Sequence, residues 1–178
     1  MKLRLALGAF FLFFAGLNPG AWAKSLTWKA DSFSIDVPNG WREVKDLYGI
    51  PVTILGPVEN KTRAVVQVIP TPLKDVEIKA ENAKAFGEKY AEGRRLWLKA
   101  QNGKLIELLA GRFETLKDGS KMLYAGVSYQ MNQKAFIERT FYVRCPKKIF
   151  HLKIVQNFEL VDQLDKSDAI VRSFQCKG

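Results

Sequence analysis

The stretch KMLYAGVSYQMNQKAFIERTFYVRCPKKIFHLKIVQN, residues 121–157, decides the fold. Apolar and polar residues alternate along two long runs within it, 135–145 and 149–157, and this period of two is typical of β-strands. A Pro-Lys-Lys segment separates the runs and ends the first, because proline cannot donate a hydrogen bond within a central ladder. Residues 121–130 form a third run, which ends at the polar turn Met-Asn-Gln-Lys. We therefore predict an antiparallel meander with a buried face on which the rest of the chain packs.

The rest of the chain alternates between short strand patterns and two helical patterns. A tight reversal is expected at Pro38-Asn39-Gly40-Trp41, where proline and Asn-Gly favour a turn, and Trp41 and Val44 are then expected to fold back over the preceding strand. We predict short strands at 26–29, 33–37, 51–56, 63–69 and 104–113, and helices over 76–102 and from 160 to near 176, the second continuous or broken at 165–168.

The longer helical segment carries an apolar stripe. Its apolar residues recur at spacings of 3, 4 and 7, as expected for one face of a helix, and they are Ala83, Phe86, Tyr90 and Trp97. Gly103 follows where a helix-ending glycine is expected. We predict that this face, anchored by Phe86 and Trp97, packs on the sheet. Stacking of the aromatic side chains on nucleic acid is the other interpretation, and predicted export of the protein argues against it.

The first 23 residues have the features of a secretory signal. Lys2 and Arg4 supply the positive start, residues 5–17 the apolar core, and Ala21-Trp22-Ala23 a small-x-small cleavage site. A membrane-spanning helix, the alternative, needs about 20 unbroken apolar residues, whereas Asn18-Pro19-Gly20 closes this run. We predict cleavage after Ala23, which leaves residues 24–178 as a single domain. No cysteine follows the cleavage site to carry a lipid, so a periplasmic or secreted protein is expected.

The chain is basic, with a formal net charge of +10, of which Lys2 and Arg4 contribute two. Such a balance favours anionic partners: phospholipid, a polyanionic glycan or an acidic protein face. Scattered solvating charges are the other interpretation, because the longest basic runs are only pairs. The residues predicted to bind a partner, as one positive patch if the helix end meets a turn of the meander, are Arg94, Arg95, Lys99, Lys147 and Lys148.

Cys145 and Cys176 are the two cysteines of a chain predicted to reach an oxidising compartment. One disulfide between the end of a core strand and the C-terminal tail is the economical interpretation. Two buried free thiols, or a metal site shared with His151, remain as alternatives. A metal site is disfavoured because two Cys and one His are too few for a closed zinc shell.

Motifs of common catalytic sites are absent from the sequence. It contains no Gly-x-Ser-x-Gly elbow, His-Glu-x-x-His pair, phosphate-binding loop or dinucleotide glycine fingerprint. His151, the single histidine, is expected to be a partly exposed strand residue and not a general base. Acidic residues expected to be solvated strand-edge and turn charges are Asp36, Glu43, Asp46, Glu107, Glu114 and Glu138. We predict no catalytic residue, no metal and no cofactor.

The order of elements resembles the PsbP-like fold family. The resemblance covers most of residues 30–175 and is carried by Phe-x-Ile-x-Val-Pro-x-Gly-Trp at 33–41, a short Pro-bounded strand, a helix, a long meander and a terminal helix that ends in Val-Arg-Ser-Phe at 171–174. This fold is shared by the extrinsic PsbP subunit of photosystem II, a Ran-binding nuclear factor and bacterial periplasmic proteins of the DcrB type. The resemblance implies an α+β domain, an antiparallel β-sheet packed by helices as an α/β/α sandwich, that binds or stabilises a partner.

These observations lead to one functional expectation and two alternatives. We expect an exported, non-enzymatic binding or accessory protein of the bacterial cell envelope that engages a macromolecular partner, with peripheral membrane contact open and nucleic acid excluded. A small carboxylate-dependent hydrolase would instead show a deep pocket with convergent titratable groups. A carrier of a small apolar ligand would show an enclosed dry cavity between sheet and helix.

Overall fold

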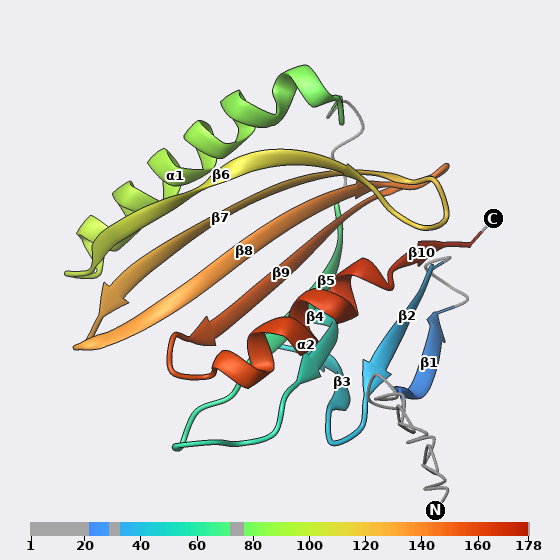
Figure 1. Ribbon diagram of the computed structural model, residues 1–178, viewed down its shortest axis with the longest axis horizontal. Helices are drawn as coiled ribbons and strands as arrows, with labels where there is room; N and C mark the ends of the chain where they lie inside the picture. The colour runs from blue at the N-terminus through green and yellow to red at the C-terminus, as the bar shows by residue number, and fades with distance from the viewer. Residues whose placement is uncertain (1–21, 29–32, 72–76, 178) are drawn as a thin grey trace, which may run out of the picture.

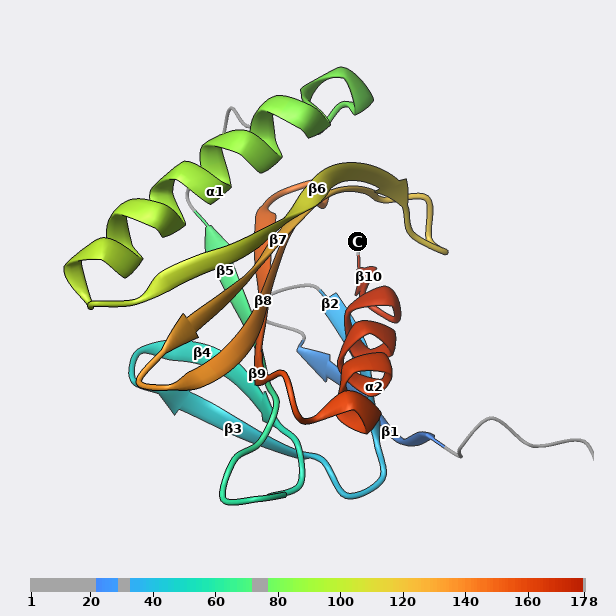
Figure 2. The ribbon, with the colours of Figure 1, turned by 60° about the vertical axis from the view of Figure 1, so that its left-hand side comes forward.

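The computed structural model describes residues 22–28, 33–71 and 77–177. The predicted signal, residues 1–23, lies outside the described residues apart from its last two positions, as do Lys29 and Val76 at the ends of predicted elements. The described chain forms two antiparallel sheets and two α-helices, with one helix on each side of the larger sheet (Figure 1, Figure 2). This arrangement confirms the predicted α+β class. No helix in the described ranges is long and apolar enough to cross a membrane.

The larger sheet contains the predicted meander. Its strands are β3 (Arg42–Leu47), β4 (Ile50–Leu55), β5 (Val65–Thr71), β6 (Lys104–Thr115), β7 (Lys121–Met131), β8 (Lys134–Arg144) and β9 (Ile149–Asn157). They lie in the order β3-β4-β5-β9-β8-β7-β6, and each of β6 to β9 pairs antiparallel with the next strand in the chain. Asn132 and Gln133, with φ of 50° and 63°, form the turn between β7 and β8. Strands β6 and β3 are the two edges.

A smaller sheet lies beside the larger one, and the sequence did not predict this division. It contains β1 (Trp22–Trp28), β2 (Phe33–Pro38) and β10 (Gln175–Cys176), in the order β1-β2-β10. The predicted reversal after β2 is confirmed, because the Trp41 N–H donates to the Pro38 carbonyl at 3.2 Å and Gly40 has a φ of +82°. Trp41 is buried in the same core cluster as Ile35 and Val37 of β2. The chain then leaves the small sheet, and β3, which contains the half-buried Val44, pairs with β4 in the larger one.

Helix α1 (Ala83–Ala100) follows the short 3-10 helix η1 (Ala80–Asn82) and covers β6 and β7. The predicted stripe is only partly right. Phe86 and Tyr90 are half-buried and Trp97 is 39% exposed. The residues that α1 buries are Ala83, Gly87, Ala91 and Leu98.

Two glycines explain why α1 turns small residues towards the sheet. A Cβ atom at Gly111 of β6 would lie 1.9 Å from the Ala83 carbonyl oxygen, and one at Gly87 would lie 2.7 Å from the Gly111 nitrogen. Such close backbone contact leaves no space for a large side chain along the line where helix and strand meet. The aromatic side chains of α1 therefore lie along one flank of the helix, against aromatic residues of β7 and β8.

Helix α2 (Val161–Arg172) lies on the opposite side of the larger sheet (Figure 2). It is continuous, so the break that the sequence left open at 165–168 does not occur. Gln163 is buried on this helix and connects it to the segment between β4 and β5. Its Nε2 donates to the Pro57 carbonyl at 3.1 Å, and its Oε1 accepts from the Ala64 N–H at 3.0 Å.

The main core lies between the larger sheet, the smaller sheet and α2. Phe33 of β2, Phe150 of β9 and Phe174 after α2 are all buried, with ring centroids 5.1 to 5.3 Å apart. Burial of each such side chain stabilises the fold by about 1.5–3 kcal/mol. The phenylalanine that opens the 33–41 motif and the one that closes the terminal helix thus meet in one cluster.

The predicted disulfide is present. Cys145 and Cys176 are bonded, with their Cα atoms 5.5 Å apart, which joins the end of β8 to β10 of the small sheet. Asp118, in the turn between β6 and β7, accepts from the Cys176 N–H at 2.7 Å. Because both sulfur atoms are bonded, the alternatives of free thiols and of a metal site shared with His151 are excluded.

Candidate functional site

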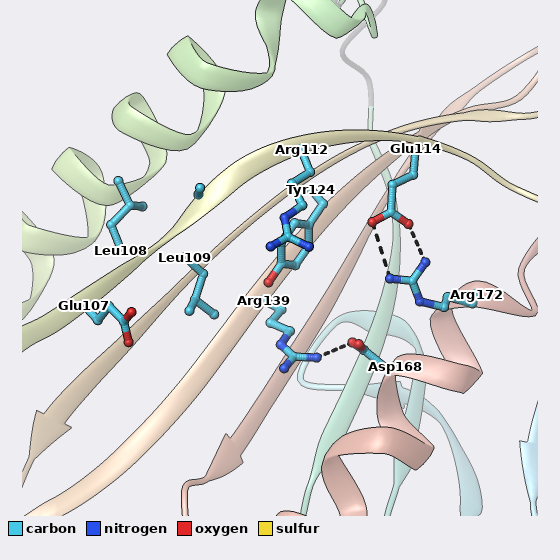
Figure 3. Close-up of a pocket in the computed structure, with 10 residues that line it drawn as sticks. Glu107, Leu108, Leu109, Arg112, Glu114, Tyr124, Arg139, Asp168 and Arg172 are labelled. Carbon is cyan, nitrogen blue, oxygen red and sulfur yellow. Dashed lines mark hydrogen bonds and ion pairs between the residues drawn. The ribbon is translucent and has the colours of Figure 1, made fainter.

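A cleft of about 470 Å³ lies under β6, β7 and β8, on the side of the larger sheet that faces α2 (Figure 3). Most of its wall comes from the edge strand β6, and the rest from β7, β8 and α2. The lining residues are Glu107, Leu108, Leu109, Ala110, Arg112, Glu114, Tyr124, Arg139, Asp168 and Arg172.

Strand register places the central side chains of the cleft. Arg112 of β6 pairs directly with Tyr124 of β7. Two residues further along β7, Gly126 pairs with Leu109 on one side and with Arg139 on the other. Because alternate residues of a strand point to the same face, Tyr124 and Gly126 share a face. This face therefore carries a tyrosine hydroxyl, two guanidinium groups and one apolar side chain.

Two ion pairs connect the sheet to α2 across the cleft. Arg139 Nη1 lies 2.5 Å from Asp168 Oδ1, and Arg172 donates to both carboxylate oxygens of Glu114 (Figure 3). Asp168 and Arg172 are four residues apart, so they project from the same flank of the helix. These contacts hold α2 at a fixed distance from β6 and β8.

Two donors in the cleft remain without a protein acceptor. Arg112 is exposed, and it makes no hydrogen bond or ion pair with the residues that the structure describes. The Nε atom of Arg139 is buried and has no hydrogen-bond partner in the same ranges. Burial raises the pKa of the Tyr124 hydroxyl, so this group stays protonated at neutral pH and can also donate. The site is therefore equipped to bind an anion.

The titratable side chains that line the cleft are three carboxylates, three arginines and Tyr124. No His, Ser or Cys is among its lining residues, and both carboxylates nearest to α2 are paired with arginines. His151 points to the opposite face of the sheet, where its Nε2 lies 2.6 Å from Thr140 Oγ1 and its ring stacks on Tyr142. No group of three or more His, Cys, Asp or Glu side chains that could hold a metal ion occurs in the described ranges.

Glu138 is not the solvated charge that the sequence suggested. Its side chain is 2% exposed and lies on the α1 side of β8. It accepts from the Tyr90 hydroxyl, from Arg94 Nη2 at 2.9 Å and from Lys153 Nζ at 3.1 Å. Arg94 in turn lies 4.0 Å from the centroid of the Trp97 ring. Tyr90 and Arg94 of α1 and Lys153 of β9 thus all pair with Glu138 of β8 beneath the flank of α1.

The residues predicted to form one positive patch lie at two ends of the molecule. Lys147 and Lys148 are exposed in the turn between β8 and β9, beside the start of α1. Arg95 and Lys99 are exposed near the end of α1, beside the turn between β7 and β8 (Figure 1). Arg94 is half-buried and paired with Glu138. The helix does not bring these groups together, and whether either group binds a partner stays a prediction.

The sequence analysis missed every charged residue at the centre of the cleft, although one signal was visible. Arg139 shares a face with Phe141 and Val143 in the strand pattern, which puts a cation on an otherwise apolar face. A charge in such a position calls for a partner or a ligand. Its partner, Asp168, is on α2, and no periodicity within β8 could identify it.

The comparisons with known proteins rest on structure alone, because no family profile and no curated protein matches the sequence. Cyanobacterial PsbP from Synechocystis is similar over 96% of this chain and 98% of its own, with a TM-score of 0.58 and 14% identity. LpqN, described as involved in cell envelope biogenesis of Mycobacterium tuberculosis, is similar over 82% of this chain and 83% of its own, with a TM-score of 0.56 and 20% identity. The chain has the PsbP-like fold that its sequence motifs indicated.

Proposed function

We propose that this protein is an exported, non-enzymatic accessory protein of the bacterial cell envelope, and that it works by binding an anionic partner molecule in the cleft beside α2. The signal-like pattern at residues 1–23 supports export. The structural likeness to LpqN, whose description places it in envelope biogenesis, supports the compartment and the accessory role.

One observation carries the proposal. The cleft places Arg112, Arg139 and Tyr124 on one face as donors, with no Ser, Cys or His among its lining residues. Converging donors of this kind favour the binding of an anionic group. The basic balance of the chain favours the same sign of partner.

Export and cleavage are tested by mass spectrometry of the intact protein. The protein recovered from the extracytoplasmic fraction of its host should begin at Lys24. A mature chain that retains residues 1–23, or protein found only in the cytoplasm, would contradict this part of the proposal.

Binding in the cleft is tested by affinity capture of the exported protein, followed by mass spectrometry of all that co-purifies. The wild-type chain is compared with Arg112→Glu, which reverses the charge inside the cleft, and with Lys99→Glu and Lys147→Glu, which reverse charges at the two ends. We expect the captured partner to be lost from Arg112→Glu and retained by the other two. Equal capture by wild type and Arg112→Glu would overturn the cleft as the binding site.

A further inference from the structure

We propose that the cleft binds a small molecule that carries a carboxylate or phosphate group next to an apolar body, with the anionic group held between Arg112 and Arg139 at the Tyr124 hydroxyl. The inference rests on the proposed function and deepens it by naming the class of ligand and the atoms that recognise it.

The first step of the argument concerns charge. Asp168 and Glu114 are already paired with Arg139 and Arg172, so these two carboxylates do not neutralise Arg112. Glu107, the third acidic lining residue, projects from the far end of the cleft, and Leu109 lies between it and Arg112 (Figure 3). Positive and negative lining residues are equal in number, and Arg112 is the arginine among them that no carboxylate in the described ranges pairs with.

The second step concerns hydrogen bonds. The Nε atom of Arg139 is buried without an acceptor, and a buried donor left unpaired costs about 1–3 kcal/mol. The cross-strand pairing of Arg112 with Tyr124 places a second guanidinium beside the hydroxyl. Arg139 belongs to the same face, because it pairs with Gly126, two residues from Tyr124, and all three side chains line the cleft. An anion with two or three oxygen atoms would accept from all of them, as carboxylate and phosphate do with arginine.

The third step concerns shape. Gly126 forms part of the face between Leu109 and Arg139, and a Cβ atom there would lie 2.9 Å from Leu109 Cδ1. The half-buried Leu109 side chain therefore fills the space over Gly126 and lines the cleft on the same face as Arg139. A volume of about 470 Å³ suits a small molecule, since such sites enclose about 300–1,000 Å³. An apolar body would cover Leu109 while the anionic group reaches Arg112.

The test uses the full mature chain and three probes of equal chain length, titrated by calorimetry below their micelle concentrations: octanoate, octyl phosphate and neutral octanol. We expect the two anions to bind and octanol to bind far more weakly. Arg112→Gln should weaken anion binding about tenfold or more, the loss expected for one charged hydrogen bond. Arg42→Gln, which removes an exposed arginine of β3, is the matched control and should bind as wild type does.

A second variant separates the apolar contact from the charge. Leu109→Asn should reduce the preference for octanoate over butanoate, while wild type should favour the longer chain. Both Arg112→Gln and Leu109→Asn should keep the unfolding midpoint of wild type within a few degrees, so that lost binding is not lost folding. Equal affinity for octanol and octanoate, or anion binding unchanged in Arg112→Gln, would overturn the proposal.

The ligand's anionic group could come from a free molecule or from a lipid headgroup, and a vesicle arm distinguishes the two. Binding to phosphatidylglycerol vesicles but not to soluble octanoate, lost in Arg112→Gln, would assign the headgroup. Binding to octanoate with no vesicle binding would assign a free molecule. If no probe binds while affinity capture still depends on Arg112, the ligand class is wrong and the proposed function stands. If affinity capture also does not depend on Arg112, both the ligand class and the proposed binding in the cleft are wrong.

Discussion

The two sides of the larger sheet each pair a strand carboxylate with a helix arginine, and they use the pair differently. On the α1 side, Glu138 is buried and pairs with the half-buried Arg94, with Tyr90 and with Lys153, although Arg94 Nε has no hydrogen-bond partner in the described ranges. On the α2 side, the Arg172 side chain that pairs with Glu114 is exposed, and Arg112 nearby has no protein partner in the described chain. Buried charges must satisfy one another because water cannot. In the half-open cleft on the α2 side, the guanidinium group of Arg112 remains available to a ligand.

The largest expected effect is at the buried pair. Glu138→Gln should destabilise the fold by about 3–5 kcal/mol, because it removes the buried counter-charge of the half-buried Arg94 and Lys153. Glu114→Gln removes the exposed counterpart and should cost about 1 kcal/mol or less. Urea unfolding of both variants checks the contrast. Similar losses of unfolding free energy in the two variants would show that the buried carboxylate contributes no more to stability than the more exposed one.

The disulfide holds the α2 side covalently and should have the next largest effect. Cys145→Ser with Cys176→Ser should lower the free energy of unfolding by about 3–4 kcal/mol in the chain-entropy account, since the bond spans 31 residues. Wild type unfolded under reducing conditions should have the same midpoint as the double variant. A loss below about 1 kcal/mol would mean that the bond restricts the unfolded chain much less than its loop length indicates.

The α1 side should also respond to mild acid, through His151. Burial, with Lys153 nearby, lowers the pKa of His151 to about 4 in the folded protein, against about 6.5 when unfolded. Between these values the unfolded chain binds more protons, so stability should fall as the pH drops from 6.5 towards 4. The slope approaches about 1.4 kcal/mol per pH unit.

His151→Gln tests this dependence by comparison with wild type between pH 6.5 and 5, above the range in which ordinary carboxylates titrate. The wild-type protein should lose about 2 kcal/mol more over this interval than the variant does. Parallel pH profiles would show that His151 is not held in its neutral form.

The smallest expected effect distinguishes two neighbours on α1. Trp97→Ala should cost about 1–2 kcal/mol, because the partly exposed ring contributes an edge contact to Tyr129 and a contact with Arg94. Leu98→Ala, at a fully buried position, should cost about 2–5 kcal/mol. Denaturant unfolding decides between them. A larger loss of stability in Trp97→Ala than in Leu98→Ala would show that the aromatic stripe, and not the small-residue face around Gly87, anchors α1 on the sheet.

Most of the secondary structure could be predicted, because its signals are local. The period of two in the meander located β7, β8 and β9 to within a residue or two, and the change of period located α1. Strand β3 was missed, since Arg42–Leu47 contains four charged side chains and no alternating apolar run. It forms at the edge of the sheet by pairing with β4, whose own side chains are the buried apolar ones.

The sequence by itself determined the α+β class, the meander, the disulfide from the presence of only two cysteines, and the motif that runs from Phe33 to Trp41. Tertiary structure alone decided which side chains from distant segments meet. The contact between Gly87 and Gly111 chose the buried face of α1, and the register of β6, β7 and β8 placed Arg112 and Arg139 on one face opposite α2. Periodicity describes each element separately, whereas a cleft depends on the order and register in which the elements pack.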